Sequence, residues 1–62
     1  MMMFTAKQKV EAINRELSYR RHVYDRRVVN GSMTKELADY QIAIFEAIRD
    51  DYAKEEVAER LL

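Results

Sequence analysis

Apolar residues recur every three or four positions over two long stretches of the chain. The first stripe consists of Ala6, Val10, Ile13, Leu17, Tyr24 and Val28. This period is that of an amphipathic α-helix with one buried face. Arg20 or Arg21 fills the position that the stripe lacks between Leu17 and Tyr24. The pattern predicts a helix over about residues 5–30.

The second stretch has a wider apolar surface. Its central stripe is Leu37, Gln41, Ile44, Ile48 and Tyr52, and the flanking residues are Ala38, Ile42 and Phe45 on one side and Tyr40 and Ala47 on the other. These residues predict a helix over about residues 34–60 whose apolar arc covers about half of its circumference. One neighbouring helix needs only a narrower stripe, so the extra width predicts a further partner for this helix.

Local signals mark where each helix starts and stops. Gly31 is the only glycine and suits the left-handed residue that ends a helix, so a turn is expected at residues 30–33. Thr34 is a suitable N-cap for the second helix. Thr5 and Gln8 have the spacing of a capping box at the start of the first. The sequence therefore predicts an all-α, antiparallel two-helix hairpin.

The composition excludes several classes of protein. With 62 residues and no cysteine, the chain is expected to be one domain, 1–62, without a disulfide framework or a thiolate metal site. It is too short for a two-domain enzyme or a nucleotide-binding α/β fold. We expect no membrane association, because there is no apolar run of about 18 residues. We expect no secretory signal either, because the chain does not start with a basic segment followed by an apolar stretch.

A lone hairpin of this size buries too little apolar surface to be stable by itself. Chains below about 70 residues without disulfides or metals are rarely self-sufficient. We therefore expect a homodimer in which two hairpins form a four-helix bundle; the alternative is a marginal monomer that folds on a partner. The residues expected in the core or the dimer interface are Val10, Ile13, Leu17, Tyr24, Val28, Leu37, Ile44, Phe45, Ile48 and Tyr52.

The total charge of zero conceals an asymmetry between the two halves of the chain. Residues 1–31 carry seven basic and three acidic side chains, a net charge of +4, and residues 32–62 carry four basic and eight acidic, a net charge of −4. Antiparallel pairing of the helices is therefore electrostatically favourable, by a small amount per exposed pair.

A basic cluster in the first helix raises the question of nucleic-acid binding. It consists of Arg20, Arg21, His22, Arg26 and Arg27, interleaved with tyrosines. Phosphate binding requires clustered cations, but at 100° per residue these side chains surround the helix instead of sharing a face. We favour arginines paired to acids of the second helix or of a dimer mate, and keep nucleic acid as the alternative partner.

Other polar residues could in principle carry chemistry. Arg21 and Gln41 lie at or beside apolar stripes. We favour an Arg21 whose charged group extends to water, and keep as the alternative a buried polar contact with Tyr24, Gln41 or Tyr52 of a dimer mate. His22 with Asp25 supplies too few ligands for a metal site. The acids near the end of the second helix are expected to form a solvated face. We predict no catalytic, metal or cofactor site, and no enzyme.

Tyrosine and arginine are the residue types that most often dominate protein interfaces. Tyr19 is predicted to lie opposite the main stripe of the first helix, near Val23. The candidate residues for binding an external partner are Tyr19, Arg20, Val23, Arg26 and Arg27.

The central segment resembles a family of small uncharacterised helical-hairpin proteins encoded by tailed bacteriophages and prophages. The matching residues are Glu16-Leu17, Arg20-Arg21, Val23-Tyr24, Arg26 or Arg27, Val28, Gly31, Met33-Thr34, Ala38, Ile42, Ala47-Ile48 and Asp51-Tyr52. This chain has Gln41 where the family usually has an acid. The resemblance implies a helical hairpin that acts in the cytoplasm of a bacterial host.

The leading functional hypothesis is a non-enzymatic phage or prophage module that binds and modulates, by inhibition, a host bacterial protein. The alternative is a nucleic-acid-binding or transcription-regulating protein that uses the arginines of the first helix. A third interpretation is a structural part or small chaperone in virion assembly.

Overall fold

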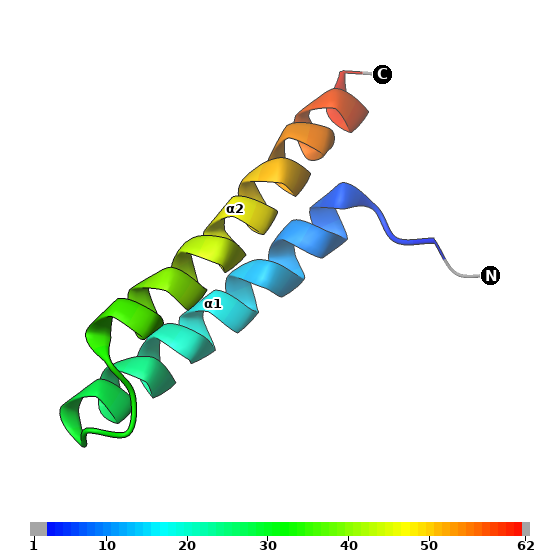
Figure 1. The fold of residues 1–62 in the computed structure, drawn as a ribbon. Helices are drawn as coiled ribbons and strands as arrows, with labels where there is room; N and C mark the ends of the chain where they lie inside the picture. Colours follow the sequence, from blue (N-terminus) through cyan, green and yellow to red (C-terminus); the bar gives the residue numbers. More distant parts are fainter. Residues whose placement is uncertain (1–2, 62) are drawn as a thin grey trace.

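The computed structural model describes residues 3–61, and in this part of the chain it has two helices, α1 (Ala6–Val29) and α2 (Lys35–Arg60). The helices lie side by side and antiparallel, so the start of α1 and the end of α2 share one end of the hairpin (Figure 1). The predicted all-α hairpin is confirmed. Residues 1–2 and 62 of the predicted domain lie outside the described residues.

Both helix starts have the predicted N-caps. The Thr5 hydroxyl accepts a hydrogen bond from the Gln8 amide at 3.1 Å, and the Gln8 side chain accepts one from the Thr5 amide at 2.9 Å. The Thr34 hydroxyl accepts a hydrogen bond from the Leu37 amide at 3.1 Å. Each contact satisfies an amide that has no partner within its own helix.

The turn between the helices depends on its glycine. Gly31 has a φ of 83°, in the left-handed region that side chains with a Cβ rarely adopt. The Gly31 amide donates to the Val28 carbonyl at 3.2 Å, and the Ser32 amide donates to the Arg27 carbonyl at 2.9 Å. This pair of bonds is the Schellman motif, which stops α1 and allows the chain to reverse.

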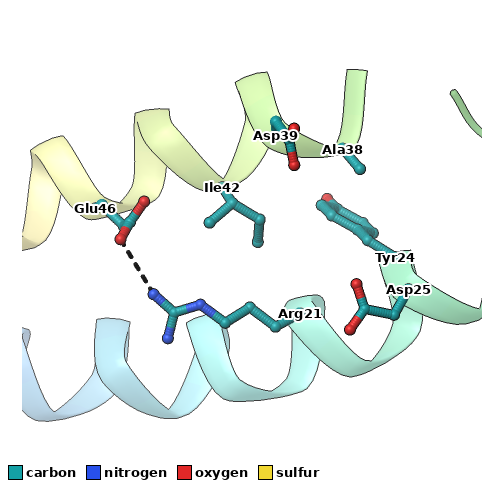
Figure 2. Close-up of a pocket in the computed structure, with 7 residues that line it drawn as sticks. All are labelled: Arg21, Tyr24, Asp25, Ala38, Asp39, Ile42 and Glu46. Carbon is teal, nitrogen blue, oxygen red and sulfur yellow. Dashed lines mark hydrogen bonds and ion pairs between the residues drawn. The ribbon is translucent and has the colours of Figure 1, made fainter. Parts of the chain in front are cut away.

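Apart from Tyr52, which belongs to both, the face of α2 that packs on α1 lies one position away from the predicted central stripe. The residues at this interface are Ala38, Ile42, Phe45 and Tyr52, whereas Leu37, Ile44 and Ile48 are 47%, 38% and 37% exposed. Ala38, with its small side chain, lies opposite Tyr24, and both are buried (Figure 2). The adjacent row is therefore left on the outside of the single chain.

The buried core of the described chain is small. Its buried residues are Ala6, Leu17, Tyr24 and Ala38, and Leu17 is the one large side chain that is almost completely covered. The other predicted core positions Val10, Ile13, Val28, Phe45 and Tyr52 are half-buried. A core of this size contributes little apolar burial in relation to the length of chain that it must order.

The hairpin also has a large surface for its mass. Its principal extents are 48 × 20 × 17 Å, and its accessible surface is 5107 Å². A compact protein of 7.4 kDa exposes roughly 4200 Å², so the excess is about 900 Å². Over residues 3–61, neither helix is long and apolar enough to cross a membrane.

Candidate interaction surfaces

Arg20 lies at the α1/α2 interface and is bound within the chain. Its guanidinium donates to the Glu16 carboxylate and to the Tyr24 hydroxyl, each at 2.8 Å, and it lies 4.4 Å from the centre of the Phe45 ring. The hydrogen bond to Tyr24 is the main cause that raises the pKa of Arg20. Arg20 is therefore the residue that fills the gap in the first stripe, and its charged group contacts an aromatic ring of α2.

Arg21 pairs with an acid of the other helix. Its guanidinium lies 3.2 Å from the Glu46 carboxylate, an exposed pair that joins α1 to α2 across a groove of about 430 Å³. Within the chain the ion-pair partner of Arg21 is Glu46, and the contact of Arg21 with Tyr24, Gln41 or Tyr52 of a dimer mate stays a prediction. This pairing agrees with the preference for arginines bound to acids of the second helix.

The charged groove has one cation and three carboxylates along its rim. Arg21 and Glu46 close one end of the groove. Asp25 and Asp39 lie toward the other end, near Tyr24 and Ala38, and Ile42 lies between the two ends (Figure 2). The Lys35 amine lies 2.9 Å from Asp39, and this hydrogen bond is the main cause that raises the pKa of Lys35. The groove is shallow and its carboxylates are exposed, which does not favour acid–base chemistry.

The end of α2 is bound to the start of α1 through Glu59. Both carboxylate oxygens of Glu59 accept from the Ala6 amide at 3.2 Å. A carboxylate is favourable at a helix N-terminus because the helix dipole is positive there. The sequence predicts only a solvated acidic face at the end of α2. The antiparallel arrangement gives Glu59 a second role, as a cap for α1.

A row of aliphatic residues on α2 has no covering element in the described chain. One residue turns an α-helix by about 100°. Ala38 and Phe45 face α1, and the residues that follow them, Asp39 and Glu46, lie at the charged groove. The residues that precede them, Leu37 and Ile44, must therefore lie on the opposite side of the hairpin. We call the surface formed by Val23 of α1 and Leu37, Gln41, Ile44 and Ile48 of α2 the open face.

The outer side of α1 carries the remaining partner-binding candidates. Tyr19 is 66% exposed, and Arg26 follows it by seven residues, so the two lie on the same side of the helix. Arg27 is also exposed, and neither Arg26 nor Arg27 has an ion pair within residues 3–61. Val23, the α1 residue of the open face, borders this surface and is half-buried.

The one histidine of the chain is exposed. His22 lies beside Asp25 and Arg26 on α1. In the part of the chain that the structure describes, no three His, Cys, Asp or Glu side chains are close enough together to hold a metal ion.

Sequence reasoning identified most of these residues but missed three contacts between the helices. The Glu59 cap and the cation–π contacts of Arg20 with Phe45 and of Lys9 with Tyr52, at 4.9 Å, all depend on how far α2 is shifted along α1. The length of the turn fixes that shift. A count of residues from the turn outward would have placed position 59 near position 6.

Comparison of the chain with protein-family models, with curated proteins and with solved structures finds no match.

Proposed function

We propose that this chain is a non-catalytic protein-binding module that self-associates through its open face and binds a second protein through the outer side of α1. The observation that carries the proposal is the open face itself, because a single hairpin leaves its aliphatic row of Leu37, Ile44 and Ile48 in water. Such a row costs solubility unless a partner covers it.

The accessible surface supports self-association. The excess of about 900 Å² over a compact protein of this mass is close to the roughly 800 Å² that each partner buries in a standard interface. A homodimer of two hairpins, in the form of a four-helix bundle, brings each chain to an ordinary proportion of buried surface.

The outer side of α1 supports a second, different partner. Tyr19 and Arg26 lie on the side of α1 that faces away from α2, so they stay accessible in a dimer that covers the α2 row Leu37, Ile44 and Ile48. Tyrosine and arginine supply most of the binding energy in many interfaces. From the resemblance to bacteriophage and prophage proteins, we propose that the second partner is a host protein of the bacterial cytoplasm and that binding inhibits it.

A pull-down with matched variants tests the second-partner proposal. Tagged protein and the variant Tyr19→Ala/Arg26→Ala are incubated with bacterial lysate, with Lys54→Ala on the exposed side of α2 as the control. We expect a specific host protein that the wild type and Lys54→Ala retain and the double variant loses. Equal retention by all three proteins would contradict the proposed site.

Nucleic-acid binding is the second candidate, because Arg26 and Arg27 are exposed without an ion pair among residues 3–61. The cluster is weaker than its sequence indicates, since Arg20 and Arg21 are bound to Glu16, Tyr24 and Glu46. A gel-shift titration across salt concentrations separates the candidates. Binding to nucleic acid must fall steeply as salt rises, and such binding by wild type that Arg26→Ala/Arg27→Ala abolishes would favour this alternative.

A further inference from the structure

The α2 residues of the open face have a symmetric spacing, which is the same whether it is counted from the N-terminal or the C-terminal end. Leu37, Gln41, Ile44 and Ile48 follow one another at intervals of four, three and four residues. A two-fold axis perpendicular to α2, placed midway between Gln41 and Ile44, therefore maps the row onto itself. It sets Leu37 against the partner's Ile48 and Gln41 against the partner's Ile44, which is the layer pattern of an antiparallel helix pair.

From this symmetry we propose that the partner on the open face is a second copy of this chain, packed with α2 antiparallel to the partner's α2. The inference depends on the self-association proposed above and adds the orientation of the two copies.

The distribution of apolar residues along the two helices favours contact of α2 with α2. On the open side of the hairpin, α2 contributes Leu37, Ile44 and Ile48, whereas α1 contributes Val23 and the charged residues Lys9 and Glu16. If α2 packed on the partner's α1, aliphatic side chains would meet ions that require water. Packing on the partner's α2 buries aliphatic residues against each other.

The charges that continue the row select the antiparallel direction. Beyond Ile48, the same side of α2 carries Asp51 and Glu55, which are exposed. In a parallel pair each of these carboxylates would lie beside its own copy, which is destabilising. In the antiparallel pair the axis sets Asp51 at the level of the partner's Thr34, the N-cap of the partner's α2. The positive end of that helix attracts an acid.

Cysteine cross-linking tests the orientation without background, because the chain has no cysteine of its own. In the antiparallel pair, the two copies of position 48 are separated by eleven residues, or about 16 Å along the axis, whereas a disulfide needs Cα atoms within about 7 Å. Ile48→Cys alone should therefore form no disulfide dimer under mild oxidation. An equimolar mixture of Leu37→Cys and Ile48→Cys should form a disulfide-linked heterodimer as its main product.

The possible outcomes separate this inference from the proposed function. Efficient self-linking of Ile48→Cys indicates a parallel pair and overturns the inference, and so does a dimer in which positions 37 and 48 fail to cross-link. A wild-type chain that sediments as a monomer overturns self-association itself. Each reduced cysteine variant is first shown to sediment as the wild type does.

A spin-label measurement supplies a second readout that leaves the open face intact. Ala58 is exposed near the end of α2, so Ala58→Cys can carry a nitroxide with little effect on packing. The antiparallel arrangement places the two labels about 45 Å apart along the axis, because they lie at opposite ends of the bundle. A distance below about 30 Å would place both ends of α2 together and contradict the inference.

Discussion

Two faces of α2 differ in composition and in what covers them. The face on α1 contains Ala38, Phe45 and Tyr52 with the cations Arg20 and Lys9 over the two rings, whereas the open face is mainly aliphatic. The contacts within the chain thus combine small and aromatic residues with directional polar bonds. The most hydrophobic row stays partly exposed in the single chain, which supports the proposal that the hairpin specifies its shape internally and obtains much of its apolar burial from association.

The largest expected effect is the loss of the large, almost completely covered side chain of Leu17. Leu17→Ala should reduce the free energy of unfolding by about 3 to 5 kcal/mol, because it removes buried methyl groups and leaves a cavity. The measurement is urea unfolding followed by circular dichroism. A scaffold of this size has little more stability than that to lose.

Leu37→Ala makes the same chemical change on the open face. It should weaken association more than it destabilises the helices of a single chain, since Leu37 is half-exposed in that chain. If Leu17→Ala and Leu37→Ala lowered the free energy of unfolding equally at low protein concentration, the open face would contribute to the single chain as much as its core does, which would contradict the distinction between the two faces.

A charge on the open face should disrupt association. Ile48→Asp places an unpaired carboxylate among aliphatic residues, and we expect a loss of about 3 kcal/mol in dimerisation, or roughly a hundredfold in Kd. Sedimentation across a concentration series gives the Kd. Val57→Asp is the matched control, because Val57 is a similarly exposed apolar residue of α2 outside the open face. Dissociation by both variants alike would contradict the assignment of the face.

Removal of the carboxylate that caps α1 should have a moderate effect. Glu59→Ala leaves the Ala6 amide without its cap at the start of α1, so we expect a loss of about 1 kcal/mol in unfolding free energy. Glu59→Gln keeps an oxygen acceptor and should lose about half as much. Urea unfolding measures both, with the exposed Glu11→Ala as the control. If Glu59→Ala and Glu11→Ala unfold alike, the cap makes no contribution.

The smallest effect is expected at the exposed pair between the helices. Arg21→Gln should destabilise the hairpin by about 0.5 kcal/mol or less, because water and salt screen the attraction between Arg21 and Glu46. Unfolding at low and high salt should give a difference between wild type and variant that shrinks as salt rises. A difference that is independent of salt would indicate that the stem of Arg21 contributes by packing instead.

Local sequence chemistry determined much of the fold. The caps at Thr5 and Thr34 and the left-handed Gly31 depend on residues within a few positions of each other, so they could be predicted directly. The packed row of α2 could not, because two adjacent rows are both apolar. The aliphatic row appeared the better core, but Ala38 permits the close approach that Tyr24 requires.

The candidate surfaces were predictable to a lesser extent. Tyr19 and Arg26 are exposed, as their helical positions indicate, because solvent exposure on a single helix follows from spacing alone. Arg20 proved to be bound within the chain, since its partners Tyr24 and Phe45 become neighbours through helix geometry and cross-helix packing together. To predict contacts between helices, one must know how far one helix is shifted along the other, and sequence periodicity does not give this shift.

We propose that a second copy of the chain covers the open face, and sedimentation equilibrium of the unmodified protein decides whether it does. At tens of micromolar and moderate salt, we predict a single species of twice the 7.4 kDa chain mass, with a helical circular dichroism spectrum. A fully helical species of 7.4 kDa under the same conditions would contradict the claim.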